Sequence, residues 1–404
     1  MPFLVRLAVS MMKKEARSSF WPDLQPEILG LVLLRLPSLA DRVRLRAVCR
    51  PWRSNARLQP LPSPLPWLTL LNGTFLSIPD GKIIRMPAPD DAFCFGSIDS
   101  WLFFVRSAGG CSLVNPFSKA TLDLPKLFIK WFEAIPRFGS TFQKLVVPSP
   151  LESSPGSLVA AMILDNDGRI HLYRPPMATY LSARRNQRLF DYVSDITFFN
   201  EKFYGLGSLD VLMTFELNYG ADSKPRISCV KCIVEYPSVC VRLPKPLSRK
   251  LSYLVKSYLV ECCGRLLMVK RIIGFTDTTP EHPLGCTREH PLGCDRTAAF
   301  EVYEADLSTK PGQWRCLTTL GGQVLFVGKH HSKSFPAGES TGFQEDCIYF
   351  MCDYRNDAVD PLHDSGVYNM RNGIITPLLS DTAAVPKHHG GQWRPTWLFP
   401  ADTM

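Results

Sequence analysis

Residues 258–269 read Tyr-Leu-Val-Glu-Cys-Cys-Gly-Arg-Leu-Leu-Met-Val, in which two short apolar runs flank a turn at Gly264. Short apolar runs joined by a glycine turn predict a β-hairpin. The same pattern occurs in residues 196–204 around Asn200 and in residues 366–375 around Asn372-Gly373. Hairpins therefore dominate this part of the chain, and long helical periodicity is scarce.

Two more hairpins are predicted nearer the amino terminus. Residues 101–105 pair with residues 111–114, and residues 160–164 pair with residues 169–173. Hairpins that recur at roughly forty- to sixty-residue steps favour a β-propeller. A pair of β-sandwiches is the alternative, and the number of blades stays open because no strict repeat is visible.

The amino-terminal part differs from the rest, because residues 26–36 carry apolar side chains at helical spacing. One stripe of this helix holds Ile28, Leu29, Val32, Leu33 and Leu36. Leu31 and Leu34 are apolar as well, so the helix is apolar nearly all round. A short helix of this kind buries one side in its own module, and we expect the other side to meet another protein. The alternative is that it packs wholly against the carboxy-terminal domain.

Two further short helices are predicted before residue 58. Ser38 and Asp41 resemble a capping box that opens the second helix, and Pro51 suits the first turn of the third. The second helix is expected to place Leu39, Val43, Ala47 and Val48 inward, with Arg42, Arg44, Arg46 and Arg50 outward. Three helices of this length form a marginal core that a partner usually completes.

The chain is therefore predicted to be a multidomain protein with one small α part and one large all-β part. Residues 59–66 read Gln-Pro-Leu-Pro-Ser-Pro-Leu-Pro, which indicates an extended linker. The expected divisions are a flexible segment at 1–19, a helical module at 20–57, a Pro-rich linker at 58–66 and a β-propeller-like domain at 67–404.

Composition is that of a folded globular protein, with 45% hydrophobic and 21% charged residues among 404. The net charge of +9 is mild for this length, so it permits an acidic partner without demanding nucleic acid. The 13 cysteines follow no disulfide framework, and no segment is predicted to span a membrane. We expect a protein of the cytoplasm, the nucleus or both, with neither nucleic acid nor membrane as a partner.

The string Trp21-Pro-Asp-Leu-Gln-Pro-Glu-Ile-Leu29, with Arg35-Leu36, Asp41 and Arg44-Leu-Arg-Ala-Val-Cys-Arg-Pro-Trp-Arg53, closely resembles a plant F-box. Gln25 departs from the family, which often has proline there. The resemblance implies docking onto a Skp-type adaptor and, through it, a cullin of a ubiquitin ligase. By position, the residues it assigns to that interface are Leu24, Pro26, Ile28, Leu29, Val32, Leu33 and Leu36.

A second resemblance covers most of the large domain. Trp101-Leu102, Leu113-Val-Asn-Pro-Phe117, Gly264-Arg-Leu-Leu-Met-Val269, Phe300-Glu-Val-Tyr303 and Leu320-Gly-Gly-Gln-Val-Leu-Phe-Val327 look like the plant KIB-like β-propeller domain. In that family an F-box commonly precedes the propeller. The resemblance thus implies a three-helix F-box followed by a large propeller.

Several short motifs resemble chemical sites, and each is better explained as structure. Gly338-Glu-Ser-Thr-Gly342 matches a nucleophile elbow, but a strand follows it where that elbow needs a helix. The tandem copy in residues 281–296 places two histidines and two cysteines at a spacing that no common zinc module has. Cys229 and Cys232 lie in a strand-like run, and residues 165–168 form a turn. No catalytic residue, metal site or cofactor is predicted.

The leading hypothesis is a non-catalytic substrate-recognition subunit of a Skp–cullin–F-box ubiquitin ligase. The helical module would bind the Skp-type adaptor, and the propeller would bind a protein target of unknown identity. The alternative is a ligand-binding or enzymatic propeller with a non-functional F-box. A basic nucleic-acid binder is a third and weaker option.

Overall fold

The structure is a computed structural model, and it divides the chain into two compact units with a boundary between Pro64 and Leu65. This boundary lies inside the predicted linker. The residues that the structure describes are 24–36, 38–59, 61, 64–70, 73–78, 81–86, 92–106, 110–124, 142–148, 151, 159–163, 170–174, 177–179, 193–219, 221, 225–235, 251–276, 296–338, 341–354, 362–379 and 395–400.

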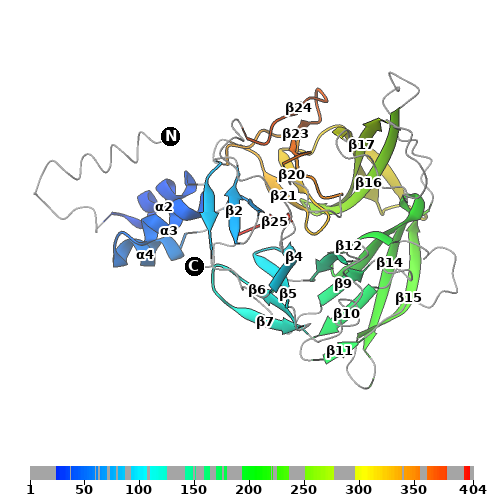
Figure 1. Ribbon diagram of the computed structural model, residues 1–404, viewed down its shortest axis with the longest axis horizontal. Coiled ribbons are helices and arrows are strands. Elements are labelled where there is room, and N and C mark those ends of the chain that lie inside the picture. The colour runs from blue at the N-terminus through cyan, green and yellow to red at the C-terminus, as the bar shows by residue number, and fades with distance from the viewer. Residues whose placement is uncertain are drawn as a thin grey trace, which may run out of the picture. The chain divides into compact units, whose positions relative to one another are not determined.

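The first unit contains the three predicted helices, α2 (Pro26–Leu34), α3 (Leu39–Arg46) and α4 (Arg50–Arg57) (Figure 1). Pro26 occupies the first turn of α2, where a missing N–H costs no helical hydrogen bond. The core of the unit is small and consists of Leu29, Leu33, Leu45, Trp52 and Ala56. Gln59, which follows α4, donates from Nε2 to the carbonyl of Pro26 at 3.1 Å and so ties the two ends together.

Helix α3 presents a different face to the core from the one its sequence predicts. Leu39, Arg42, Leu45 and Arg46 are buried, whereas Val43, Ala47 and Val48 are exposed. The prediction that Arg42 and Arg46 face outward is therefore wrong. Arg42 donates from Nε to the carbonyl of Leu36 at 2.7 Å, so this buried guanidinium satisfies a backbone acceptor just after the end of α2.

The second unit is built from strands, which form six sheets among the described residues. The prediction of a β-propeller is confirmed, because the innermost strands of these sheets succeed one another around a common centre (Figure 1). The first three sheets in chain order contain β1 (Trp67–Thr69), β2 (Thr74–Ser77), β3 (Ile83–Arg85), with β25 (Trp397–Leu398); β4 (Ala92–Ile98), β5 (Trp101–Arg106), β6 (Cys111–Val114), β7 (Thr121–Leu124); and β8 (Phe142–Val146), β9 (Val159–Ile163), β10 (Ile170–Arg174), β11 (Met177–Thr179).

The other three sheets complete the propeller. They contain β12 (Val193–Phe199), β13 (Lys202–Gly207), β14 (Leu212–Tyr219), β15 (Pro225–Val234); β16 (Leu251–Cys262), β17 (Arg265–Thr276), β18 (Arg296–Asp306), β19 (Gln313–Leu317); and β20 (Gln323–Val327), β21 (Lys333–Pro336), β22 (Cys347–Phe350), β23 (Gly366–Asn369), β24 (Ile375–Thr376). A single 3-10 turn, Ser208–Asp210, separates β13 from β14.

The carboxy-terminal strand closes the propeller by joining its first sheet. Trp67 and Leu68 on β1 pair antiparallel with Leu398 and Trp397 on β25, which is the innermost strand of that sheet. Residues almost the whole length of the domain apart therefore belong to one blade. The first blade is therefore built from both ends of the domain, and this closes the ring of blades.

The predicted hairpins are all confirmed as strand pairs, including β12 with β13, β16 with β17 and β23 with β24. Two of their tight turns contain consecutive residues with positive φ, namely Asn200 and Glu201, then Cys263 and Gly264. Positive φ at both central residues matches the right-handed twist of a hairpin, which explains why asparagine and glycine occur there.

The last sheet departs from simple up-and-down order. Strand β20 pairs parallel with β22, and β21 folds back to take the inner position that the first strand holds in the four preceding blades. In the connection after β20, residues 328–332, His331 and Ser332 line one cavity together with residues near the carboxy-terminal ends of β4, β12 and β16.

The linker makes more contacts than its proline content predicts. Leu65 is buried in the core of the first and last sheets, and Leu61 packs against the helical unit. The carbonyl of Pro66 accepts a hydrogen bond from the N–H of Ile78 at 3.1 Å. The tandem copy around residues 281–295 and the turn at 165–168 lie outside the described residues. Within the described part, no helix is long and apolar enough to cross a bilayer.

Candidate partner-binding surfaces

The first candidate surface is the outer side of α2. Ile28, Leu31 and Val32 are 45%, 55% and 41% exposed, while Leu29 and Leu33 on the same helix have no exposed surface. Large apolar side chains that stay in water on a nine-residue helix lose the stabilisation that burial would supply. This side of α2 is therefore suited to a protein partner that covers it.

The seven residues that the F-box resemblance assigns to the interface fall into three groups. Pro26, Ile28 and Val32 are exposed, and Leu24 and Leu36 are half-buried against the core. Leu29 and Leu33 lie inside that core. A fully buried side chain cannot contact a partner in this conformation, so these two residues hold α2 in place, which differs from the direct contact expected of them.

Other apolar residues of the unit are exposed without having been assigned to the interface. They are Leu31 and Leu34 on α2, Val43 on α3, Val48 just after it, and Leu58 just after α4. Leu31 and Leu34 could be found from the sequence, because they make α2 apolar on all sides. Val43 and Val48 could not, because their exposure depends on Arg42 and Arg46 taking the buried positions of α3.

The second candidate surface is a cavity of about 380 Å³ at one end of the propeller. Five inner strands or the turns next to them contribute to it: β4 through Ile98 and Asp99, β8 through Lys144–Pro148, β12 through Thr197 and Phe198, β16 through Leu259 and Glu261, and the segment around β21 through His331–Ser334. A cavity lined by both polar and apolar side chains is typical of a binding site.

A buried ion pair forms part of this cavity. Lys144 on β8 and Asp195 on β12 approach to 2.8 Å, and both side chains are almost fully buried. Asp195 also accepts hydrogen bonds from the N–H groups of Leu259 at 2.6 Å and Ile196 at 2.8 Å. One carboxylate therefore joins three neighbouring blades. Burial raises the pKa of Asp195, and the donors around it offset only part of the cost of burying its charge.

A second group of charges lies at the opposite wall. Lys333 on β21 and Asp99 after β4 form an ion pair at 2.8 Å, and the N–H of Asp99 donates to Nδ1 of His331 at 2.9 Å. Burial lowers the pKa of His331 to about 4, despite the nearby Asp99 carboxylate. For Asp99, burial opposes the charge, but His331 and Lys333 outweigh burial and lower the pKa. At neutral pH the imidazole is therefore uncharged and the carboxylate is ionised.

Comparison with known proteins identifies the propeller. The sequence profile of the KIB1-4 β-propeller matches residues 75–369, which is most of the chain. This protein belongs to the KIB1-4 β-propeller family. Two Arabidopsis thaliana proteins are each 22% identical: F-box protein At2g26160, over 84% of this chain and 97% of the relative, and Putative F-box protein At1g65770, over 82% and 89%.

Among solved structures, the β-propeller domain of Cps50 (Swd1) from Myceliophteria thermophila matches 76% of this chain and 90% of that chain. It is 9% identical, with a TM-score of 0.32. The KIB1-4 match over residues 75–369, not this likeness, establishes the family. Together with the Arabidopsis relatives, it confirms that the protein resembles plant F-box proteins with a KIB-like propeller.

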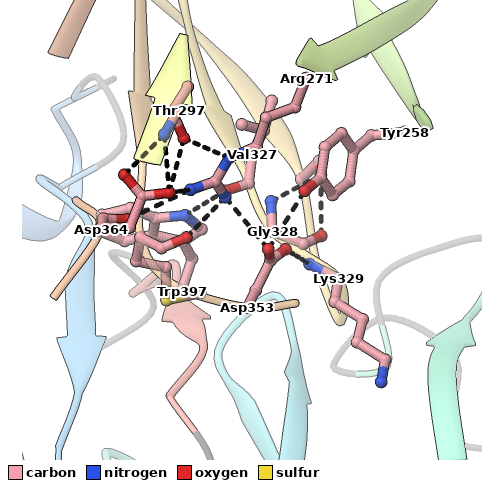
Figure 2. Close-up of polar contacts among 11 residues, drawn as sticks. Tyr258, Arg271, Thr297, Val327, Gly328, Lys329, Asp353, Asp364 and Trp397 are labelled. Atoms are coloured by element: carbon pink, nitrogen blue, oxygen red, sulfur yellow. Dashed lines mark hydrogen bonds and ion pairs between the residues drawn. The ribbon is translucent and has the colours of Figure 1, made fainter. Parts of the chain in front are cut away.

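A buried polar network holds one wall of the cavity in the KIB1-4 propeller (Figure 2). Arg271 on β17 donates from Nη1 to Asp353 at 3.1 Å, and Asp353 accepts from the N–H of Lys329 at 2.6 Å. On its other side Arg271 donates to Asp364 at 2.9 Å. The network thus fixes Lys329, two residues before the cavity residue His331.

Gly328 lies in the same segment, where neighbouring atoms leave little room for a side chain. A Cβ there would lie 3.1 Å from atoms of Met351 and Trp397 and 3.2 Å from the carbonyl oxygen of His331.

Burial opposes the charge of Arg271, but Tyr258, Asp353 and Asp364 outweigh burial and raise its pKa. The guanidinium therefore stays charged, and the chain that leads to the cavity is held on both sides.

The motifs that resemble chemical sites carry no such arrangement in the propeller. Gly338 and Thr341 form a tight turn through the Gly342 N–H, and the strand β22 follows. Glu339 and Ser340 lie outside the described residues. Cys229 and Cys232 lie on β15, and no group of three histidine, cysteine or acidic side chains in the described ranges could hold a metal ion.

Proposed function

We propose that this KIB1-4 propeller protein is a non-catalytic, substrate-recognition subunit of a Skp–cullin–F-box ubiquitin ligase. Its helical unit would bind the Skp-type adaptor, its propeller would bind a target protein, and other subunits would carry out ubiquitin transfer. The relatives named F-box proteins support this role.

The observation that carries the proposal is the exposure of Ile28, Leu31 and Val32 on α2. The core beneath them is small, so the unit gains from a partner that buries this surface. An apolar contact at the centre of an interface often supplies most of its binding energy. A single charge introduced there should therefore abolish adaptor binding.

Co-purification of the full chain with a Skp-type adaptor tests this proposal. Ile28→Asp and Leu31→Asp place a charge on the exposed side of α2, and we expect each to lose the adaptor. Ile374→Asp is the matched control, because Ile374 is 56% exposed and lies in the propeller. Circular dichroism should be unchanged for all three. Normal adaptor recovery with both α2 variants would contradict the proposal.

A further inference from the structure

The cavity at the end of the propeller has a charge pattern that selects its ligand. Five ionisable side chains line it, namely Asp99, Lys144, Glu261, His331 and Lys333, and Asp195 lies directly behind Lys144. The two lysines are each paired with an aspartate at 2.8 Å. His331 is neutral, so Glu261 leaves the cavity with one negative charge in excess.

The carboxylate of Glu261 is a hydrogen-bond acceptor that lines the cavity and has no partner among the described residues. It lies at the end of β16, is exposed, and takes part in no hydrogen bond or ion pair within the described part of the chain. Its place in the fold is fixed, since the Leu259 N–H two residues earlier binds the buried Asp195. A fixed strand end therefore presents a carboxylate that is free to accept.

The walls beside Glu261 suit a long side chain with a cationic end. Phe198, which is half-buried, supplies apolar surface, against which a methylene chain packs while its charged head stays near water. The Phe198 ring stacks on Phe203 with centroids 4.8 Å apart, so it is held in place. Aromatic rings at such sites attract guanidinium and ammonium groups.

We propose that this cavity binds a basic side chain, arginine or lysine, of the protein that the propeller recognises. The aliphatic part of that side chain lies against Phe198, and its cationic group binds Glu261. The volume of about 380 Å³ is at the lower end of the roughly 300–1,000 Å³ usual for ligand pockets, which fits one side chain. This inference rests on the proposed role of the propeller in target binding.

An anionic ligand is disfavoured by the same contacts. A phosphate or carboxylate would have to compete with Asp195 for Lys144 and with Asp99 for Lys333, and it would face the Glu261 carboxylate. Asp195 is buried, so an anion that drew Lys144 away from it would leave a buried carboxylate without its counter-ion. The cation therefore needs no rearrangement of the cavity, whereas the anion needs one.

Titration of the full chain with short blocked peptides tests the proposal. The probe is acetyl-Gly-Gly-Arg-Gly-Gly-amide, and its binding is followed by NMR line widths of the arginine side chain. Peptides with citrulline or glutamate in place of arginine are the comparisons, and free N-acetyl-arginine amide distinguishes a peptide from a small cation. We expect the arginine peptide to bind at least about tenfold more tightly than the citrulline peptide.

Variants assign the binding to Glu261. Glu261→Gln keeps the shape and removes the charge, and we expect about tenfold weaker binding of the arginine peptide. Glu235→Gln is the matched control, because Glu235 is an exposed glutamate after β15 and does not line the cavity. Its binding should equal that of the unaltered chain.

Three results would overturn the inference: no binding of the arginine peptide at about 10 mM, equal binding of the citrulline peptide, or no effect of Glu261→Gln. Tighter binding of the glutamate peptide would also overturn it and would make the two lysines an anion site. Adaptor co-purification of the unaltered chain separates the two proposals. Absence of arginine-peptide binding by the unaltered chain, with normal adaptor recovery, contradicts this inference alone, whereas failure of the unaltered chain to bind the adaptor contradicts the proposed function.

Discussion

Arg271 and Asp353 form an ion pair, 3.1 Å between Nη1 and Oδ1, in which neither side chain has more than 1% of its surface exposed. The pair joins β17 of one blade to the segment that follows β22 of the next. Arg271 also contacts Asp364 at 2.9 Å and donates from Nε to Thr297 at 2.8 Å. The guanidinium therefore ties β17 and β18 of one blade to the segments that follow β22 and precede β23 in the next.

Arg271→Met should destabilise the propeller strongly. The methionine fills part of the space, but Asp353 and Asp364 lose their counter-ion while they stay buried. Removing one partner of a buried ion pair costs about 3–5 kcal/mol, because the remaining charge is uncompensated. Urea unfolding of the full chain, followed by tryptophan fluorescence, measures the loss.

The triple variant Arg271→Met, Asp353→Asn and Asp364→Asn is the control for this explanation. It removes the charges together and should recover most of the lost stability, since neutral amides are cheaper to bury than unpaired carboxylates. A triple variant that is less stable than Arg271→Met alone would show that packing, not charge, accounts for the loss.

Leu29 and Leu31 should respond very differently to truncation although they lie two residues apart on α2. Leu29→Ala removes a side chain from a core of five buried residues and should cost about 2–5 kcal/mol, enough to unfold the helical unit. Leu31→Ala truncates a side chain that is 55% exposed and should change stability by about 0.5 kcal/mol or less. Hydrogen exchange of the amides in residues 26–57 distinguishes the two. Equal protection in both variants would contradict the observed core.

The helices and hairpins could be predicted from the sequence because their signals are local. Proline at the start of α2 and the Asn200–Glu201 turn each determine the conformation of a few neighbouring residues. The buried face of α3 could not be predicted, since arginine is normally exposed and Val43 normally buried. The hydrogen bond from Arg42 to the carbonyl of Leu36 depends on how two helices meet, which no local pattern contains.

The cavity could not be predicted for the same reason. Its charged residues Asp99, Lys144, Glu261 and Lys333 are separated by dozens of residues and share no motif. Only the order of the blades brings them together, and the pairing of Lys144 with Asp195 depends on two adjacent inner strands. In the helical unit, by contrast, the apolar character of α2 is visible in the sequence itself.

His331 should make the protein less stable in mild acid. The pKa of this histidine is lowered to about 4 in the folded chain, against about 6.5 when unfolded, because burial disfavours the charged ring. Between about pH 4 and pH 6.5, His331 is protonated in the unfolded chain but not in the folded chain. The stability that is present above about pH 6.5 is therefore lost as the pH falls through this range. From pH 7 to pH 4.5 the loss should be about 2–3 kcal/mol.

Urea unfolding of His331→Asn at the two pH values isolates this contribution. The asparagine oxygen can accept from the Asp99 N–H in place of Nδ1, and it does not titrate. We expect the variant to lose less stability than the unaltered chain over the same pH range. Equal losses would mean that His331 is protonated in the folded protein.

Closure of the propeller should depend on Trp397, which is fully buried on β25. Its indole N–H donates to the carbonyl of Val327 at 2.8 Å, so the strand that begins the ring's first blade is attached to the last blade as well. Trp397→Ala should cost about 3–5 kcal/mol, because it leaves a large cavity and an unpaired carbonyl. Trp397→Phe keeps most of the apolar volume and should cost about 1–3 kcal/mol for the lost hydrogen bond.

Leu307→Ala, at a residue that is 36% exposed, is the control and should change stability little. Thermal unfolding measured by calorimetry should rank the three in that order. If Trp397→Ala unfolds at the same temperature as Leu307→Ala, the carboxy-terminal strand does not stabilise the ring.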